Sequence, residues 1–537
     1  MLSYARGPDA PLLEETIYEA FARIAGRFPA APALSVPFQG LELTFADLSY
    51  EVDRVAGALQ ALGLEPGDRF GVWATNCAEW IYLQLAAARC GLVLVNVNPA
   101  YRAHELGYVL SRSRMKAIFL HQRDRRSDYA AILEEAQAQA DVSLRHTVYL
   151  GTQSWDSFLA AARSPCDVAI HDGDVANIQY TSGTTGSPKG VLLTHRNLVN
   201  NGWYMARAMR LSEQDRICVP VPMYHCFGCV GATIPMVTAG AAVILPSPSF
   251  DPLATLEAIH RYRATVIYGV PTMFIAELDH PDFARFDLTS LRTGIMAGAP
   301  CPIEVMKRVV DVMHCPQMTI MYGQTESSPI ITGSAVDDSL ETRVGTVGRA
   351  FPNTEVKIAG VSGETLPLGE QGELCARGYL IMKGYDGDAA ATARAVDSDG
   401  WLHTGDLATM REDGCFRITG RAKDMIIRGG ENIYPREIEE FLYTHPKIAD
   451  VQVVGLPDAR LGETVAAWIR LKPGETATED EIRSFCHGRI AHFKAPQYIS
   501  FVDQFPMTVT GKIQKYRIRE IEIEARGLQQ AANVETA

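Results

Sequence analysis

Apolar residues recur every three or four positions in residues 17–28 and again in residues 48–59, which places them on one face of a helix in each segment. Thr44 precedes the second segment and supplies its N-cap. Short apolar runs then predict strands at residues 69–73, 93–97 and 117–120, with a helix at about residues 79–89. This alternation continues to about residue 420 and predicts parallel sheets that are covered by helices.

The pattern changes after Gly420. The remaining chain has strand and helix signals of its own. The strands are expected at residues 451–454, 466–471 and 498–502, and the helix at residues 479–490. A segment of about 115 residues is long enough to form a small separate core. We therefore predict an N-terminal domain of residues 1–421 and a C-terminal domain of residues 422–537.

The longest uncharged stretch, Cys226–Phe250, is long enough to be tested as a membrane span. It is interrupted by Pro235, Pro246 and Pro248 and reads as a small-residue helix, a turn and a strand at residues 242–245. A buried α/β unit is therefore the preferred interpretation. The N-terminus lacks the positively charged and apolar regions of a signal peptide, so we expect a cytoplasmic protein without an integral membrane segment.

Composition narrows the class of protein further. The 537 residues are 47% hydrophobic and 21% charged, which is typical of a globular protein of about two to four domains. The formal net charge of −13 argues against a dedicated nucleic-acid-binding protein, because such proteins carry a basic surface. Eleven cysteines are too sparse for a disulfide framework. The CxxC pair of Cys226 and Cys229 lacks the second pair of a structural zinc site, so buried thiols are expected.

The densest chemical signal is the segment Tyr180–Gly190, which reads Tyr-Thr-Ser-Gly-Thr-Thr-Gly-Ser-Pro-Lys-Gly. Its glycines let the backbone approach an anion closely, and successive N–H and hydroxyl groups form a cradle for phosphate. In a Walker P-loop the lysine is followed by serine or threonine, whereas Lys189 is followed by glycine. The segment therefore predicts a phosphate-binding loop of another type.

This loop is similar to the signature of the adenylate-forming superfamily, which includes acyl-CoA synthetases, luciferases and peptide-synthetase adenylation domains. Four later segments resemble other motifs of that superfamily in the same order. They are Met321–Glu326 (adenine and magnesium), Trp401–Asp406 (ribose), Gly420–Tyr434 (hinge and thiol donor) and Thr508–Lys515 (catalytic lysine). The resemblance implies an α/β fold. Its large N-terminal domain has layered sheets flanked by helices plus a barrel, and its small C-terminal domain is mobile and of α+β type.

The resemblance also implies the chemistry. ATP converts a carboxylate into an acyl-adenylate and pyrophosphate, and the thiol of CoA then displaces AMP. Such a site works mainly by positioning and by charge stabilisation. ATP, Mg²⁺ and CoA are therefore the expected cofactors and co-substrates, and the expected partners are small molecules rather than nucleic acid.

By the same resemblance, two groups of residues hold the nucleotide's phosphates and its adenine. The phosphate group comprises Thr181, Ser182, Gly183, Thr184, Thr185, Gly186 and Lys189. The adenine group comprises Gly298, Ala299, Pro300, Tyr322 and Gly323, with the ring of Tyr322 stacked on the base.

Four further residues are assigned to the ribose, the metal and the α-phosphate. Asp406 is expected to accept hydrogen bonds from the ribose hydroxyls, since an ionised carboxylate only accepts, and Arg421 is expected to support the ribose or phosphate. Glu326 is the expected magnesium ligand, because hard cations prefer carboxylate oxygens. Thr325 is expected to donate to the α-phosphate.

In this family pattern Lys512 bridges the substrate carboxylate and the α-phosphate, a duty that suits a point charge on a flexible stem. Lys515 is expected to be solvated. Lys423 occupies the hinge position, at which the C-terminal domain would rotate to withdraw Lys512 and form the CoA channel. The expected channel residues are Arg428, Gly429, Gly430 and Glu431.

His225 and the segment after it bear on the acyl substrate. In acyl-CoA synthetases the equivalent histidine lies at the mouth of the acyl pocket, whereas peptide-synthetase domains place an aspartate shortly after it. No acidic residue occurs between Tyr224 and Ser249, which favours a simple carboxylic acid. The segment Val347–Lys515 is most similar to medium-chain fatty-acid–CoA ligases, so we expect ligation of a medium-chain or similar hydrophobic carboxylate by a monomer or homodimer.

Four other interpretations stay open on sequence alone. One is a free-standing adenylating enzyme that loads a carrier protein instead of CoA, and another is a luciferase-like oxygenase. A third is an aromatic or sulfur-containing acid as the substrate. The fourth, of another class, is a catalytically silent nucleotide sensor, which ATP binding without pyrophosphate release would support.

Overall fold

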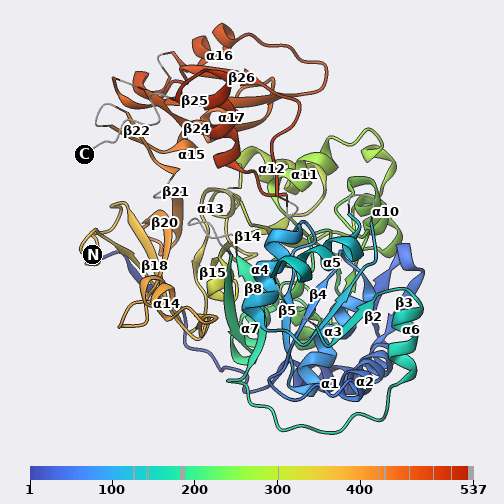
Figure 1. The fold of residues 1–537 in the computed structure, drawn as a ribbon. Helices are drawn as coiled ribbons and strands as arrows, with labels where there is room; N and C mark the ends of the chain where they lie inside the picture. The colour runs from blue at the N-terminus through green and yellow to red at the C-terminus, as the bar shows by residue number, and fades with distance from the viewer. Residues whose placement is uncertain are drawn as a thin grey trace.

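The computed structural model describes residues 1–124, 127–140, 142, 144–181, 188–299, 301–421, 424–428, 431–458, 460–487, 489–508 and 511–529, without the side chain of Asn432. In Figure 1 the large N-terminal domain runs from blue to light orange, and the small C-terminal domain, in darker orange and red, stands against one end of it. In the described part of the chain, the N-terminal domain contains three sheets and the C-terminal domain one.

The first sheet is mainly parallel. In spatial order, its strands are β19 (Gly384–Tyr385), β9 (Lys189–Thr194), β8 (Val175–Thr181), β5 (Val93–Asn96), β4 (Arg69–Trp73), β6 (Ala117–Leu120) and β7 (His146–Tyr149). Its helices are α3 (Ala78–Cys90), α4 (Ala103–Ser113), α5 (Tyr129–Ala140) and α6 (Gln153–Ala160). The three predicted strands and the helix between them are confirmed, because buried β-branched and aromatic runs pair as parallel strands here.

The second sheet is parallel in its centre and antiparallel at both edges. In spatial order, its strands are β16 (Arg349–Ala350), β15 (Ile330–Gly333), β14 (Gln317–Gly323), β13 (Thr293–Met296), β12 (Val266–Gly269), β10 (Arg216–Cys218), β11 (Ala242–Ile244), β2 (Pro32–Val36) and β3 (Leu41–Thr44). One hydrophobic cluster joins both sheets through helices between them.

The helices that accompany the second sheet include both predicted N-terminal helices. They are α1 (Ile17–Arg27), α2 (Phe45–Ala61), α7 (His195–Ala208), α8 (Cys226–Cys229), α9 (Thr233–Ala239), α10 (Pro252–Tyr262), α11 (Pro271–Leu278), α12 (Ile303–Val312) and α13 (Leu340–Gly345). Thr44 caps α2 as predicted, since its side chain accepts a hydrogen bond from the backbone N–H of Asp47.

The uncharged stretch Cys226–Phe250 forms α8, α9 and β11 within this buried layer. The interpretation as an α/β unit is therefore confirmed. Among the residues that the structure describes, no helix combines the length and the apolar character that crossing a membrane requires.

The third sheet is antiparallel throughout and lies beside the second (Figure 1). Its strands, in order, are β1 (Tyr4–Arg6), β17 (Thr354–Ala359), β18 (Gly372–Gly378), β20 (Leu402–Met410) and β21 (Phe416–Arg421), with α14 (Ala389–Ala395) before β20. Strands β20 and β21 carry the expected ribose residues, and β18 pairs with β20.

The C-terminal domain has its own sheet and its own core. Its strands are β23 (Glu431–Ile433), β22 (Ile426–Arg428), β25 (Gly462–Leu471) and β24 (Ile448–Asp458), with β26 (Tyr498–Phe501) paired to β25. Its helices are α15 (Pro435–Tyr443), α16 (Glu479–Cys486) and α17 (Lys515–Ala525). The predicted helix at residues 479–490 ends early because His487 adopts an extended backbone. The boundary between residues 421 and 422 stays a prediction, since residues 422 and 423 lie outside the described residues.

Candidate active site

Tyr322, Asp406 and Arg421 converge where the second and third sheets meet. The Tyr322 hydroxyl donates a hydrogen bond to Asp406 Oδ2 (2.8 Å), and Arg421 Nε lies 3.0 Å from Asp406 Oδ1. Asp406 and Arg421 are direct partners in the β20–β21 ladder. Burial and the neighbouring Asp406 carboxylate raise the pKa of Tyr322, so the phenol stays protonated and donates. A ribose hydroxyl would compete with Tyr322 for Asp406.

Close packing at the end of β14 leaves room only for glycine at position 323. A Cβ atom at this position would lie 1.9 Å from the carbonyl oxygen of Pro329, so a larger residue would displace the neighbouring backbone. The next two expected site residues, Thr325 and Glu326, lie in a 3₁₀ turn, Thr325–Ser327. The buried Thr325 hydroxyl lies 3.8 Å from the sulfur of Cys226.

Glu326 has a partner that the sequence did not indicate. The Tyr385 hydroxyl, from β19, donates to Glu326 Oε1 (2.8 Å), and Lys189 Nζ lies 5.1 Å from the centre of the Tyr385 ring. Burial and Glu326 raise the pKa of Tyr385, which keeps its hydroxyl protonated. Tyr385 thus links the expected magnesium ligand to the end of the expected phosphate loop. No local spacing signals this contact, because it depends on the pairing of β19 with β9.

The two ends of the phosphate loop lie side by side. Thr181 closes β8, Lys189 opens β9, and the two residues are antiparallel partners. The Thr181 hydroxyl donates to the carbonyl of Lys189 (3.5 Å). The other expected members lie outside the described residues, namely Ser182, Gly183, Thr184, Thr185 and Gly186, and so does Pro300 of the adenine group.

Lys512 lies against the N-terminal domain. A Cβ at Gly298 would lie 3.4 Å from Lys512 Cε, and the Thr272 hydroxyl donates to the carbonyl oxygen of Gly511 (3.0 Å). Gly511 has a positive φ of 77°, and a Cβ there would lie 3.0 Å from Val270 Cγ2. Glycine at position 511 therefore suits both the backbone and the close approach. The lysine-bearing turn is docked on the β12–α11 connection.

The charges that act on Lys512 come from residues of the expected nucleotide site. Burial lowers the pKa of Lys512, and Arg421 lowers it further, while Glu326 and Asp406 act in the opposite direction. The structure therefore brings together Lys512, Glu326 and Asp406 from three distant segments of the chain.

His225 is the N-cap of α8 and is neutral. Its Nδ1 accepts a hydrogen bond from the backbone N–H of Phe227 (3.2 Å), which leaves the proton on Nε2. Burial, with a smaller contribution from Lys512, lowers the pKa of His225 to about 3. At neutral pH this side chain can donate through Nε2 but carries no charge.

The expected CoA residues are only partly described. Arg428 Nη1 donates to the carbonyl of Phe493 (2.6 Å). Arg428 and Glu431 are backbone partners in the antiparallel ladder of β22 and β23. The remaining members, Lys423, Gly429 and Gly430, lie outside the described residues. These contacts of Arg428 lie within the C-terminal domain.

The expectation that Lys515 is solvated is wrong. Its side chain is only 22% exposed, and its Nζ lies 2.6 Å from Glu439 Oε1. The Glu439 side chain is 6% exposed and also accepts from the backbone N–H of Val453 (2.8 Å). The pair connects α15 to the first residue of α17, because both helices pack on β24, and so holds the segment that follows the Lys512 turn.

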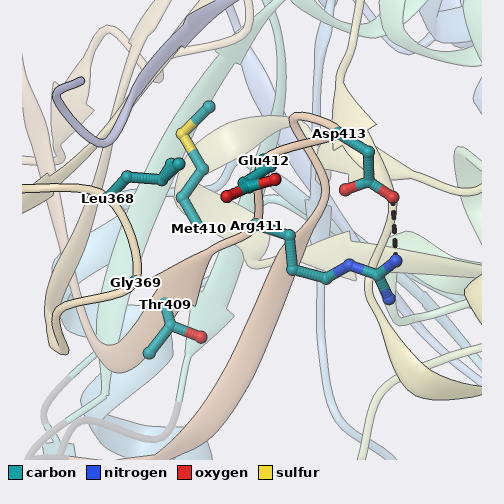
Figure 2. Close-up of a pocket in the computed structure, with 7 residues that line it drawn as sticks. All are labelled: Leu368, Gly369, Thr409, Met410, Arg411, Glu412 and Asp413. Carbon is teal, nitrogen blue, oxygen red and sulfur yellow. Dashed lines mark hydrogen bonds and ion pairs between the residues drawn. The ribbon is translucent and has the colours of Figure 1, made fainter.

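One cavity of the described structure lies away from the expected site. It has a volume of about 570 Å³ and is open to solvent at the β20–β21 turn, where Arg411 pairs with Asp413 at 3.0 Å (Figure 2). None of the expected site residues lines it. A small pocket of about 20 Å³ does touch the expected site, since Tyr180, Lys189 and Tyr385 line it.

Comparisons with known proteins agree with this arrangement. The AMP-binding enzyme family matches residues 21–386, and the AMP-binding enzyme C-terminal domain matches residues 437–512. The putative acyl-CoA synthetase YngI of Bacillus subtilis is 48% identical over 96% of this chain and 98% of its own length. Medium-chain acyl-CoA ligase ACSF2, mitochondrial, of Homo sapiens is 43% identical over 97% of this chain and 89% of its own.

Solved structures show the same fold. The anthranilate CoA ligase AuaEII in complex with anthranoyl-AMP has a TM-score of 0.88 and 27% identity, covering 96% of this chain and 99% of that one. ATP-bound MatB from Rhodopseudomonas palustris has a TM-score of 0.83 and 30% identity, covering 95% of this chain and 100% of that one. The predicted fold class is therefore confirmed, and the chain belongs to the AMP-binding enzyme family.

Proposed function

We propose that this protein ligates a medium-chain or similarly hydrophobic carboxylate to CoA at the expense of ATP. The class, an AMP-forming acid–thiol ligase, is supported by family membership and by relatives that are named acyl-CoA synthetases. The observation that carries the mechanism is the docking of the Lys512 turn against Gly298, in the same site as Glu326 and Asp406.

The reaction has two halves. In the first, a carboxylate oxygen attacks the α-phosphorus of ATP, and the bond to pyrophosphate breaks. In the second, the CoA sulfur attacks the acyl carbonyl carbon, AMP leaves with the bridging oxygen, and the thiol proton is released. Lys512 approaches the reacting carboxylate and α-phosphate, where a fixed cation stabilises the negative charge that gathers in the transition state.

The ribose and the base are bound by the Tyr322–Asp406–Arg421 group. Asp406 exchanges its hydrogen bond from Tyr322 for hydrogen bonds from the ribose hydroxyls, and the ion pair with Arg421 orients the carboxylate. Tyr322 is then free to lie against adenine beside Gly298 and Ala299. ATP-bound MatB, which shares this fold, supports ATP as the nucleotide.

Glu326 suits a magnesium ion. Tyr385 occupies Oε1 of this carboxylate, which leaves Oε2 to face a cation, and one carboxylate with phosphate oxygens and waters is the usual ligand set for Mg²⁺ beside a nucleotide. When bound, the ion would neutralise phosphate charge. Tyr385 would hold the carboxylate in place.

The C-terminal domain is proposed to turn about Lys423 between the two halves. This motion would withdraw Lys512 and bring Arg428, Gly429, Gly430 and Glu431 to the site as a CoA channel. Hinges of this kind lie at element ends that absorb backbone changes.

The substrate class is argued from His225 and its surroundings. The neutral His225 offers a donor without charge, and Tyr224, Phe227 and Tyr268 beside it are buried. The absence of an acidic residue between Tyr224 and Ser249 leaves no partner for a substrate ammonium group in this segment. A relative named as a medium-chain acyl-CoA ligase supports the length of the acyl chain.

A cytoplasmic location and a monomeric or homodimeric state stay predictions.

The proposed substrate is tested by pyrophosphate release with Mg-ATP and straight-chain acids of two to sixteen carbons, with and without CoA. Turnover that CoA stimulates and that peaks at six to twelve carbons is expected. A best rate with acetate would contradict the substrate class. Pyrophosphate exchange that CoA never accelerates would move the acceptor to a carrier protein.

Glu326→Gln is expected to raise the Mg²⁺ concentration needed for half-maximal pyrophosphate release by about tenfold, because the neutral amide is a weaker ligand for a hard cation. The measurement is a Mg²⁺ titration at fixed ATP. Glu412→Gln, at an exposed position, is the matched control and is expected to leave the titration unchanged. An unchanged midpoint in Glu326→Gln would remove the assignment.

Thr272→Val is expected to slow adenylation about fivefold to tenfold, because it removes the hydroxyl that holds Gly511 and so loosens Lys512. Thr272→Ser keeps the donor and is expected to restore the rate. Thioesterification of supplied acyl-adenylate serves as the second readout and is expected to stay within about twofold. Equal losses in both half-reactions would show that Thr272 acts only through stability.

A further inference from the structure

A second group of side chains that could bind a metal ion lies in the antiparallel third sheet. Glu373 and Cys375 are two residues apart on β18, so both side chains point to the same face. His403, on β20, is the direct partner of Cys375 in the ladder. One ligand atom from each of the three lies within 4.8 Å of the others. Glutamate oxygen, cysteine sulfur and histidine nitrogen are each ligand atoms that zinc uses in proteins.

The distances suit a single ion. His403 Nδ1 lies 3.5 Å from Cys375 Sγ and 2.8 Å from Glu373 Oε2. With bonds of about 2.1 Å to nitrogen and about 2.3 Å to sulfur, the separation of 3.5 Å corresponds to an angle of roughly 105° at the ion. This angle is close to tetrahedral. Two ligands at about 2.1 Å lie about 3.4 Å apart, so Glu373 would move outward from its present 2.8 Å.

The surroundings of His403 also suit metal binding. Asp397 Oδ2 lies 3.5 Å from His403 Nε2, on the side of the ring away from the cluster. A carboxylate in this position fixes the tautomer that presents Nδ1 to an ion. Two cations oppose a bound ion, since Lys357 and Arg377 stack on the nearby Trp401 ring at 4.7 and 4.6 Å. An ion pair with Glu355 at 2.8 Å reduces the effect of Arg377.

The burial of the three side chains gives the cluster one closed and one open side. Cys375 is fully buried and packs with Ala359 and Trp401. The side chains of Glu373 and His403 are 29% and 31% exposed, so this side of the cluster faces solvent, which would supply a water as fourth ligand. A thiolate and an imidazole select Zn²⁺ and similar ions over Mg²⁺ or Ca²⁺.

We propose that Glu373, Cys375 and His403 bind one Zn²⁺ or similar transition ion, with water as the fourth ligand and Asp397 orienting the histidine. Binding forms bonds to the sulfur, to Nδ1 and to a carboxylate oxygen. The thiol proton is released to solvent, and the histidine binds as a neutral imidazole with its proton on Nε2, toward Asp397.

This site is connected to the proposed ribose site. Glu373 Oε1 accepts a hydrogen bond from the backbone N–H of Gly405 (2.8 Å), and the Thr404 hydroxyl donates to the carbonyl of Leu374 (2.7 Å). Gly405 directly precedes Asp406. Drawing Glu373 toward an ion loosens its contact with Gly405, so metal binding raises the KM for ATP. This regulatory consequence rests on the proposed function, whereas the metal binding itself does not.

The binding is tested on the full chain with Co²⁺ as a spectroscopic probe and Zn²⁺ as its competitor, in the absence of substrates. One equivalent of Co²⁺ is expected to give thiolate charge-transfer absorption that Zn²⁺ removes. Cys375→Ala is expected to lose this absorption and to weaken Zn²⁺ binding at least tenfold. Cys166→Ala removes an exposed cysteine elsewhere and is expected to keep both. His403→Gln, at a partly exposed position, is a second variant in case the buried substitution disturbs folding.

The same absorption and affinity in Cys375→Ala and His403→Gln, or no absorption in the unaltered protein, would overturn the site. The link to the ribose loop is then measured as the KM for ATP with and without Zn²⁺. A Zn²⁺-dependent rise that is absent in Cys375→Ala is expected. Zn²⁺ binding with an unchanged KM would refute the link to the ribose loop alone. A lack of ligase activity with Mg-ATP and no Zn²⁺ would contradict the proposed function and leave the Zn²⁺ site standing.

Discussion

Lys512→Ala is expected to slow acyl-adenylate formation by about 10²–10³-fold, the usual effect of removing a preorganised group that stabilises charge in the transition state. The variant is expected to convert supplied acyl-adenylate and CoA to acyl-CoA within about threefold of the unaltered rate. The reason is structural. In the structure, the turn that carries the lysine is docked on Thr272 and beside Gly298, and the proposed domain motion would withdraw it before the second half-reaction. The two half-reactions are measured separately, by pyrophosphate exchange and by thioester formation.

Lys472→Ala is the matched control for this variant, because Lys472 is an exposed lysine of the same domain. It is expected to retain both half-reactions. Comparable losses of adenylation and thioesterification in Lys512→Ala would contradict the idea that the C-terminal domain presents different residues to the two steps.

Asp406→Asn is expected to raise the KM for ATP by about tenfold to a hundredfold. The substitution removes the charge that strengthens hydrogen bonds from the ribose hydroxyls, and hydrogen bonds to charged groups contribute about 1.5–3 kcal/mol. It also leaves Arg421 without its anionic partner. Steady-state kinetics with ATP as the varied substrate measure the effect.

Tyr322→Phe distinguishes the ribose contact from a purely structural one. It removes the hydrogen bond between Tyr322 and Asp406 but leaves the Asp406 carboxylate in place and free to bind ribose. A much smaller change in KM is therefore expected. Equal increases in the two variants would mean that Asp406 acts by holding Tyr322 rather than by binding the nucleotide.

Much of the fold is predictable from local patterns. The helix that Thr44 caps follows from periodicity, because it buries one apolar face. The strands near residues 70, 94 and 118 follow from short apolar runs, because these parallel strands are buried on both faces. Periodicity extends α16 too far, since the apolar spacing continues past Cys486 while the backbone turns away at His487. The spacing of apolar residues does not report such a change of backbone direction.

The sequence also predicts only part of the candidate site. Motif resemblance indicates Tyr322, Asp406 and Arg421, and the structure brings them into direct contact. Motif resemblance does not indicate Tyr385 or Thr272. The contact of Tyr385 with Glu326 arises from the pairing of β19 with β9, and the contact of Thr272 with Gly511 arises from the docking of the C-terminal domain. Contacts between distant segments carry no local spacing, and only the assembled sheets reveal them.

Lys515 illustrates the same limit in the C-terminal domain. A lysine in a polar segment is normally solvated, yet Lys515 pairs with the nearly buried Glu439. The partner lies 76 residues earlier in the chain, on a helix whose other face forms the domain core. The glutamate therefore looks like an ordinary surface residue until α15 and α17 are placed together.

The central claim is that this protein activates a carboxylate as an acyl-adenylate and then transfers the acyl group to CoA. The most direct measurement is a single-turnover experiment with ATP labelled at the α-phosphate, Mg²⁺ and a medium-chain acid such as octanoate. Without CoA, label is expected in an acyl-adenylate in amounts equal to the pyrophosphate released. Adding CoA is expected to chase all of that label into AMP, with an equal amount of acyl-CoA. Label recovered as ADP, or an acyl-adenylate that CoA leaves untouched, would contradict the claim.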